Sequence, residues 1–277
     1  RPENGRVRFT GDAASMAKAN VNLRCGERVL IRLGWFSAHS FEALFENVKA
    51  LPWENFIGSR DAFPVKGYSL NSQLKSVPAC QSIVKKAVVE RLREKYGCTE
   101  LPETGSKHQI QFAIMKDMAT LYLDTSGAPL YKRGYKLEQS EASLRETLAA
   151  SMVKIARYRG REDFYDPMCG SGTIAIEAAQ GALGIAPGLK REFDASSWSD
   201  GWAAAFAIEK DAAAAKARSE KLPIFASDND AAAVELTQEN ARRAGVLDYI
   251  TVHKANALTT DWSSKNGVLM CDPPYGV

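Results

Sequence analysis

Hydrophobic and polar residues alternate in short stretches along the first half of the chain, and amphipathic helical patterns separate these stretches. The alternation predicts strands at 5–11, 28–36 and 62–70, and a hairpin over 108–127 that turns near Lys116 and Asp117. The helical spacing predicts helices at 12–24, 40–51 and 76–97, capped by Asp12, Ser40 and Gly97. These short strand–helix units predict an α+β first half.

After residue 130 the pattern changes to a regular succession of strands and helices. A polar segment at 131–143 reads as a connector, and the Ala-rich 210–217 as helical. Helices are predicted at 144–158 and 231–245, and strands at 222–230, 249–256 and 266–276. Residues 162–183 read as a short strand, a glycine turn and a helix of small residues. Alternation of this kind predicts a parallel sheet with right-handed crossovers.

Composition and charge divide the chain in the same way. The 277 residues are 45% hydrophobic and 25% charged, as in a soluble protein, and the length predicts two domains. Residues 1–130 carry 18 Lys and Arg against 13 Asp and Glu, whereas 131–277 carry 18 against 20. The basic first half favours an anionic partner; a merely solvated surface is the alternative.

The positive charge is concentrated in residues 60–98, which have eight cations and three acids. On the predicted helix 76–97, Lys85 and Lys86 lie off the apolar stripe that includes Ile83 and Ala87. We therefore predict that this segment docks an anionic partner, with a solvated helix face as the alternative. The candidate docking residues are Lys66, Lys75, Lys85, Lys86 and Arg91, and the family resemblance given below implies that the partner is RNA.

The five cysteines contain no C-x-x-C pair and no cluster with histidine. This spacing predicts free thiols in a reducing cytoplasm rather than a zinc site, and we expect no metal. The apolar stretches are too short for a membrane span, and the first residues show no signal-peptide pattern.

The glycine turn "DPMCGSGT" follows the first strand of the predicted parallel sheet. It lacks the Gly-Lys-Ser/Thr ending of a phosphate loop, and Asp166 would repel an anion. A cationic ligand with a ribose fits better: Asp228, at the next strand end, can accept from ribose hydroxyls, and Asn256, at the following one, can meet an adenine amine. Each acid alone could be a helix N-cap, but their succession at strand ends favours a ligand site.

The last strand leads into "DPPYG", which begins at Asp272. This carboxylate can accept a hydrogen bond from an exocyclic amine, and Pro273 and Pro274 fix the turn so that carbonyls face the same amine. Tyr275 offers a ring on which a flipped base can stack. A rigid surface turn is the alternative for this stretch alone.

These two motifs resemble motifs I and IV of S-adenosylmethionine-dependent amino-methyltransferases that modify nucleobases. The stretches 128–150 and 184–193 are similar to bacterial RNA guanine-N2 methyltransferases that carry a THUMP domain. The resemblance implies a ferredoxin-like module at 1–45, a THUMP domain at 46–128 and a Rossmann-like class I methyltransferase domain at 129–277. It also implies further C-terminal strands after Val277, so we expect that this domain is incomplete.

By the same resemblance, the glycine turn would hold the methionine part of S-adenosylmethionine through Asp166, Met168, Gly170 and Gly172. Asp228 would bind the ribose with Asn229 nearby, Asn256 would bind the adenine, and Asp272, Pro273, Pro274 and Tyr275 would hold the target amine. The implied activity is methylation of guanine N2, in 23S ribosomal RNA or else in tRNA. The alternatives are a DNA adenine-N6 methyltransferase, since that target is also an exocyclic amine, and an inactive RNA-binding protein.

Overall fold

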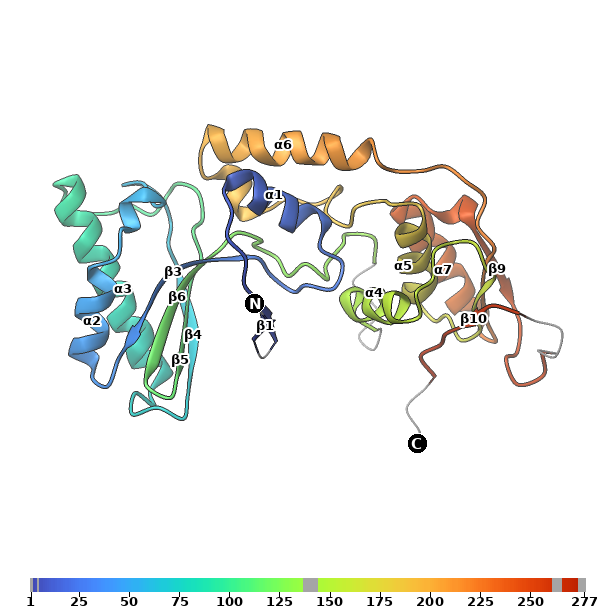
Figure 1. Ribbon diagram of the computed structural model, residues 1–277, viewed down its shortest axis with the longest axis horizontal. Helices are drawn as coiled ribbons and strands as arrows, with labels where there is room; N and C mark the ends of the chain where they lie inside the picture. Colours follow the sequence, from blue (N-terminus) through green and yellow to red (C-terminus); the bar gives the residue numbers. More distant parts are fainter. Residues whose placement is uncertain (1, 4, 137–143, 261–265, 274–277) are drawn as a thin grey trace. The chain divides into compact units, whose positions relative to one another are not determined.

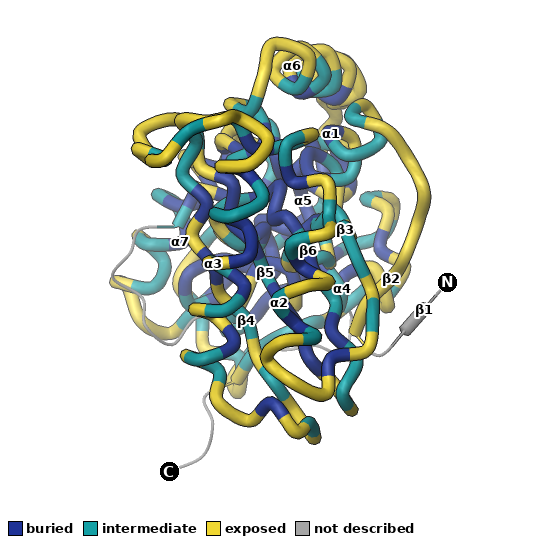
Figure 2. Tube along the Cα trace, turned by 90° about the vertical axis from the view of Figure 1, so that its left-hand side faces the viewer, coloured by how far each residue is buried: buried dark blue, intermediate teal, exposed yellow. Residues whose placement is uncertain are grey.

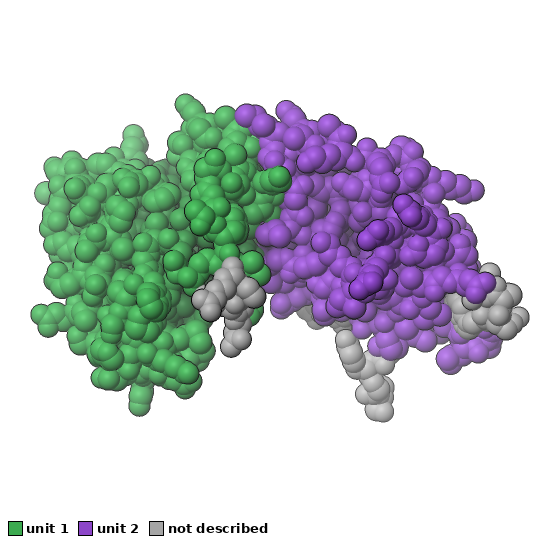
Figure 3. Space-filling view, in the orientation of Figure 1, with its two compact units in different colours: residues 1–20, 28–128, 192–207 green, residues 21–27, 129–191, 208–277 purple. Residues whose placement is uncertain are grey.

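The computed structural model describes residues 2–3, 5–136, 144–260 and 266–273. The chain folds into two compact units, which are coloured separately in Figure 3. Unit 1 contains residues 1–20, 28–128 and 192–207, and unit 2 contains residues 21–27, 129–191 and 208–277. Both units are therefore assembled from segments that are not contiguous in the sequence.

Unit 1 is built on a four-stranded sheet with the order β3-β6-β5-β4. Its strands are β3 (Leu30–Ser37), β4 (Val65–Leu70), β5 (Ile110–Met115) and β6 (Met118–Asp124). Only the β4–β5 pair is parallel. Helices α2 (Phe41–Lys49) and α3 (Val77–Tyr96) lie together on one side of the sheet (Figure 1). The core between these layers includes Leu44, Val84, Phe112 and Leu121.

Local signals in the sequence explain where the elements of unit 1 begin and end. Ser40 caps α2 by accepting a hydrogen bond from the Ala43 backbone N–H at 3.1 Å, and Ser76 caps α3 in the same way. Gly97 ends α3 with a φ of 61°, in the left-handed region that a glycine adopts without strain. The predicted helices and the β5–β6 hairpin are confirmed.

The first residues form a short hairpin, β1 (Pro2–Glu3) and β2 (Arg6–Val7), before α1 (Ala13–Asn22). Asp12 accepts a hydrogen bond from the Ser15 backbone N–H at 2.9 Å and so starts α1, as predicted. The predicted strand at 5–11 is only partly correct, because β2 has two residues. Two single-turn helices, η1 (Trp53–Asn55) and η2 (Asp194–Ser197), complete unit 1.

Unit 2 contains a parallel sheet with the order β10-β7-β8-β9, formed by β7 (Phe164–Asp166), β8 (Ile224–Asp228), β9 (Ile250–Lys254) and β10 (Val268–Leu269). Helices α5 (Thr173–Ala182) and α7 (Ala231–Ala244) pack against this sheet, and α4 (Glu146–Ile155) packs on α5 (Figure 1). One short helix, η3 (Leu247–Tyr249), precedes β9. The predicted Rossmann-like parallel sheet is confirmed, and its last strand, β10, pairs with its first, β7.

One helix is longer than the sequence predicted. Helix α6 spans Asp200–Ala214, whereas the sequence indicated helical structure only at 210–217. Its alanines have high helix propensity, but most of its positions are exposed, so no apolar stripe marks it in the sequence (Figure 2). Among the described residues, no helix combines the length and apolar character needed to cross a membrane.

Candidate functional site

The glycine turn between β7 and α5 is held in place by α7. Thr237 donates to the Gly170 backbone carbonyl at 2.9 Å, and Asn240 donates to the Ser171 carbonyl at 2.9 Å. Both side chains are buried. The Cys169 backbone N–H donates to the Ser227 carbonyl at 3.0 Å, which ties the turn to the end of β8. The turn is therefore a preorganised part of the fold.

Asp166 ends β7 beneath this turn and is 1% exposed. Neither of its carboxylate oxygens has a hydrogen-bond partner among the described residues. Burial raises the pKa of Asp166 to about 8; the nearby carboxylates of Asp228 and Asp272 also raise it, while the Ala175 backbone amide opposes the shift. A buried acid without a partner is costly, and a cation placed beside it would relieve that cost.

Asp228, at the end of β8, is half-buried and faces the glycine turn. One of its oxygens accepts from the Gly170 backbone N–H at 3.0 Å, and the other accepts from the Asp230 N–H at 3.1 Å. Each carboxylate oxygen has a second lone pair, so Asp228 can still accept from ligand hydroxyls. Asn229 is exposed beside it, and Met168 is half-buried in the turn.

Asn256 follows β9 and is exposed. Its side-chain oxygen accepts from the Leu258 backbone N–H at 3.0 Å and shapes the turn. An open pocket lies where β7, β8 and β9 end, and Ala255, the neighbour of Asn256, is one of its walls. Its lining is Tyr165, Asp166, Pro167, Phe225, Ser227, His253, Ala255 and Thr260.

The two glycines of the turn differ in their surroundings. A Cβ at Gly172 would come within 2.7 Å of the Thr237 side chain, and its φ of 78° also favours glycine. A Cβ at Gly170 would meet nothing within 4 Å, although its φ of 51° is left-handed. Gly172 is thus required for packing against α7.

The fourth strand brings Asp272 to the same edge of the sheet, because β10 pairs with β7. Asp272 is half-buried and close enough to raise the pKa of Asp166. Pro273 is exposed, and Pro274 and Tyr275 lie outside the described residues. The structure therefore brings together three of the predicted acids, Asp166, Asp228 and Asp272. In the described part of the chain, no group of His, Cys, Asp and Glu is arranged to hold a metal ion.

The predicted RNA-binding cations of α3 have acidic partners. Arg91 makes two hydrogen bonds to Glu54, at 2.9 and 2.5 Å, and Lys85 lies 2.5 Å from Glu103. Lys86 is mostly exposed and lies 3.9 Å from Glu90. These pairs reduce the charge available for phosphates on this helix. Lys75 and Lys66 are exposed outside α3.

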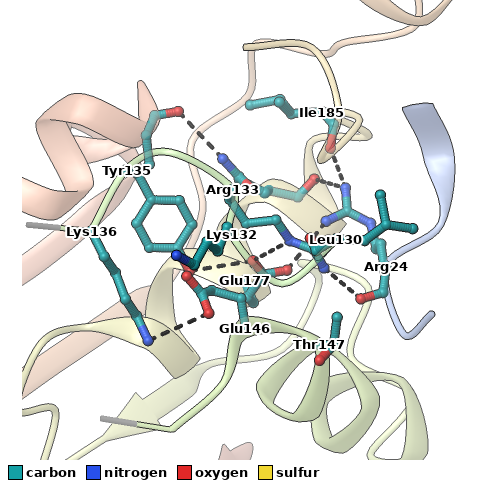
Figure 4. A network of polar contacts seen from close by, with 12 residues as sticks. Arg24, Leu130, Lys132, Arg133, Tyr135, Lys136, Glu146, Thr147, Glu177 and Ile185 are labelled. Carbon is teal, nitrogen blue, oxygen red and sulfur yellow. Dashed lines mark hydrogen bonds and ion pairs between the residues drawn. The ribbon is translucent and has the colours of Figure 1, made fainter. Parts of the chain in front are cut away.

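A polar network in unit 2 supports α5, the helix that follows the glycine turn (Figure 4). Glu177, on α5, is buried and faces two arginines: Arg133 at 3.4 Å and Arg24 at 3.7 Å. Tyr135 donates to the same carboxylate at 3.3 Å. Both arginines also donate to backbone carbonyls. Arg133 donates to those of Leu23, Arg24 and Leu130. Arg24 donates to those of Gln180 and Ile185.

Sequence reasoning missed Thr237, Asn240 and Glu177. Each is a polar residue on the buried face of a helix, and each supports the glycine turn or α5. The available signal was the pair Thr237 and Asn240, whose spacing of three places two polar side chains on one face of α7. Polar residues in a buried stripe require partners, which here are the backbone carbonyls of the turn.

The fold and the acids at the strand ends define a Rossmann-like domain with a candidate ligand site at the carboxyl edge of its sheet. Comparison with known families identifies its class. Residues 133–277 match the family described as "RMKL-like, methyltransferase domain", and the chain belongs to this family. Residues 38–124 match the THUMP domain, and residues 1–30 match the "RlmL ferredoxin-like domain".

Several relatives and solved structures are similar to the chain. "Putative RNA methyltransferase YpsC" of Bacillus subtilis is 41% identical over 99% of this chain and 72% of its own length. "Ribosomal RNA large subunit methyltransferase K/L" of Psychromonas ingrahamii is 34% identical, and the match spans only 37% of that protein.

Among solved structures, a "predicted N6-adenine-specific DNA methylase" from Listeria monocytogenes is 43% identical with a TM-score of 0.92, over 96% of this chain and 70% of the other. SMU.472, described as "a putative methyltransferase complexed with SAH", is 36% identical with a TM-score of 0.90, over 96% of this chain and 71% of the other.

Proposed function

We propose that the protein is an S-adenosylmethionine-dependent RNA methyltransferase that modifies the exocyclic N2 of a guanine. The observation that carries this proposal is the buried carboxylate of Asp166, which accepts no hydrogen bond in the described part of the chain by the distance and angle of such a bond and lies near Asp228 and Asp272 at the carboxyl edge of a parallel sheet. A ligand with a cationic group and a ribose fits this set of acids.

The residues at this edge fit the cofactor. When bound, S-adenosylmethionine supplies a methyl group that its positive sulfonium has already activated. Asp166, Met168, Gly170 and Gly172 would hold its methionine part, with the charge of Asp166 complementing the cation. Asp228 and Asn229 would take the ribose, and Asn256 the adenine. The similar SMU.472 structure, solved with SAH, supports this assignment.

The chain's own contribution to the reaction is alignment and proton acceptance. Asp272 would accept a hydrogen bond from the exocyclic amine and so orient its nitrogen towards the methyl group. Pro273 and Pro274 would fix the turn, because a proline ring restricts φ and has no N–H that could compete for acceptors. Tyr275 would stack on the extruded base. We place the proton that leaves the amine at the carboxylate of Asp272.

The THUMP match and the names of the relatives support RNA as the substrate. The relatives named for the large ribosomal subunit support 23S ribosomal RNA in particular, with tRNA as the other RNA substrate to test. The chain spans about two fifths of the length of those K/L proteins, at 37% and 40%. The ribosomal target is therefore the finer part of the proposal and needs its own test.

A DNA adenine-N6 methyltransferase is the second candidate. The sequence "DPPY" suits any exocyclic amine on a nucleobase, and the similar Listeria protein is described as an N6-adenine-specific DNA methylase. The match of the first half to the THUMP domain favours RNA, whereas its positive charge suits either nucleic acid.

Mass spectrometry of nucleosides separates the two candidates. The protein is incubated with deuteromethyl-labelled S-adenosylmethionine and either RNA or DNA from cells that lack the gene. We expect labelled N2-methylguanosine in the RNA, and none when Asp272→Ala replaces the parental protein. Labelled N6-methyladenine in the DNA, with no label in the RNA, would assign the second function instead.

A further inference from the structure

We propose that the open face of the unit 1 sheet, opposite α2 and α3, is a stacking platform for single-stranded RNA. The inference rests on RNA being the substrate and names the surface that would bind it. The platform is defined by six residues on the described strands and the N-terminal hairpin: Arg6, Arg32, Trp35, Lys66, Tyr68 and Tyr122. Figure 1 shows that the helices of this sheet lie on its other side.

A β-bulge explains why two of these residues share the open face. Arg32 and Trp35 are three positions apart, so a regular strand would place them on opposite faces. The register of β3 against β6 shifts between Arg32 and Gly34. Leu33 packs towards the core, and a Cβ at Gly34 would meet Leu51 there. The bulge thus directs both Arg32 and Trp35 outwards, and bulges often re-aim a side chain in this way.

The strand register arranges the outward residues in two rows. One row runs across the sheet from Lys66 through Gln111 and Tyr122 to Arg32. The adjacent row runs from Tyr68 through Ala113 and Thr120 to Trp35. The first row has one aromatic ring and a cation at each end, and the second has an aromatic ring at each end. Neighbouring strands are about 4.8 Å apart, so the cations of the first row stand about 14 Å apart, far enough to flank several nucleotides.

Trp35 is 63% exposed and Tyr68 is 36% exposed. Arg6 adds a planar cation between the tyrosines: it donates to the hydroxyls of Tyr122 and Tyr68, at 2.6 and 2.8 Å, and lies 5.1 Å from the Tyr122 ring centre. Bases stack on both aromatic rings and guanidinium planes.

The charge of the face favours an anionic partner. Its outward cations are Arg6, Arg32 and Lys66, and the acid in line with them, Asp124, is buried and paired with Arg28. Partial burial lowers the pKa of Lys66; the cations Arg28 and Lys107 add to this shift, and the acids Asp124 and Asp194 oppose it. Phosphates would neutralise these charges, while the rings would stack on unpaired bases. Duplex RNA hides its base faces, so a single strand fits better than a duplex.

Fluorescence anisotropy with a labelled polyuridine oligonucleotide of about 12 nucleotides tests the platform. In the full natural protein, Trp35→Ala should weaken binding about tenfold, because stacking on one aromatic ring contributes that much. Trp35→Phe should retain most of the affinity. Phe41→Ala, which removes an exposed ring from α2, is the matched control and should bind as the parent does. Arg32→Gln should make the dependence of affinity on salt shallower.

The outcomes separate this proposal from the proposed function. Unchanged polyuridine affinity in Trp35→Ala would overturn the platform, as would equal competition by a duplex of the same length. Unchanged affinity with a lower melting temperature would show that another part of the chain covers Trp35, which also overturns it. S-adenosylmethionine affinity should be the same in Trp35→Ala and the parent; a parent that binds polyuridine but not the cofactor would contradict only the proposed function.

Discussion

The carboxyl group of Asp166 is buried, and its ionised form is therefore unfavourable in the folded protein. Replacing Asp166 should change both ligand affinity and the pH dependence of stability. Its pKa is raised from 3.8 to about 8, so between these values the folded protein keeps a proton that the unfolded chain has released. The folded state then binds more protons, and the free energy of unfolding falls as pH rises through this window. At higher pH the buried charge is uncompensated unless a cation is bound.

We therefore predict that Asp166→Asn lowers S-adenosylmethionine affinity at least about 100-fold, since an ionised partner for the cation is lost. The same substitution should flatten the decline in melting temperature between pH 5 and pH 8.5, because the titrating group is gone. Calorimetry and thermal melts measure the two effects. Asp248→Asn, at an exposed acid of unit 2, is the control. An unchanged S-adenosylmethionine affinity in Asp166→Asn would show that this residue does not contribute to cofactor binding.

Gly172 gives a second residue-scale prediction. Gly172→Val should weaken cofactor binding more than tenfold, which is about 1.4 kcal/mol, because the new side chain pushes against Thr237 and distorts the turn. If the clash with the Thr237 methyl group is the cause, Gly172→Ala should be partly rescued by Thr237→Ser, although the strained φ remains. Gly181→Ala, at a helical glycine with open space around it, should keep full affinity. Equal affinity in Gly172→Val and the parent would refute the explanation.

At this scale the sequence indicated the position of each acid but not its surroundings. Asp166, Asp228 and Asp272 stand at strand ends in the sequence pattern, and their convergence follows from the geometry of a parallel sheet. The burial of Asp166 and the role of Thr237 depend on how α7 packs on the turn. A contact between residues that far apart in the chain leaves no local periodic signal, so only the structure shows it.

The helix that follows the glycine turn depends on its buried polar network. Burial raises the pKa of Glu177, while Arg133 and Arg24 oppose the shift. Arg133→Met would leave Glu177 and several backbone carbonyls without that partner. Loss of one member of a buried ion pair typically costs about 3–5 kcal/mol, so we predict a destabilisation of that order in the unfolding of unit 2.

Urea denaturation monitored by circular dichroism measures this change. The double substitution Arg133→Met with Glu177→Gln should be less destabilised than the sum of the two single substitutions, because it leaves no unpaired charge on Glu177. Arg243→Met, at an exposed arginine of α7, should change the stability by no more than about 0.5 kcal/mol. Additive effects in the double variant would mean that Arg133 and Glu177 are not coupled.

Most elements could be predicted because local signals and burial agree. Helices α2, α3 and α7 each combine an N-cap side chain with buried residues on one face. Among the described residues, β2 and β10 have two paired residues each and are shorter than the predicted strands; positions 274–276 of the predicted last strand lie outside the described residues. Extended conformation follows from sequence, but pairing requires a neighbouring strand. Helix α6 was under-predicted because alanine stabilises a helix without marking a buried face.

At the scale of the whole molecule, the interleaving of the two units could not be predicted from the sequence. Residues 21–27 belong to unit 2, where Arg24 reaches Glu177, although unit 1 residues flank them in the chain. Residues 192–207 belong to unit 1, although methyltransferase-type elements flank them. A sequence pattern indicates a domain boundary only where the composition of the chain changes. The chain passes from one unit to the other at residues 21–27 and 192–207 without such a change.

The segment 192–207 provides the last prediction, because its Trp198 covers a buried histidine of unit 1. The rings of Trp198 and His108 stack with their centres 4.5 Å apart, and the Trp198 indole N–H donates to the Lys107 carbonyl at 2.9 Å. Burial lowers the pKa of His108 to about 4, although Asp61 and Asp194 oppose the shift. The unfolded chain therefore binds more protons between about 4 and 6.5, and unit 1 loses stability as pH falls through this range.

Trp198→Ala should open this site to water and raise the pKa of His108 towards 6.5, which NMR titration of the histidine ring protons measures. The variant should be less stable than the parent at neutral pH, since a large buried contact is lost, but it should lose less further stability on acidification. Trp202→Ala is the control, because Trp202 contacts Trp198 and not the histidine ring. If the pKa of His108 is the same in Trp198→Ala and in the parent, Trp198 does not shield the histidine from water. The contact of segment 192–207 with His108 would then contribute little to the stability of unit 1.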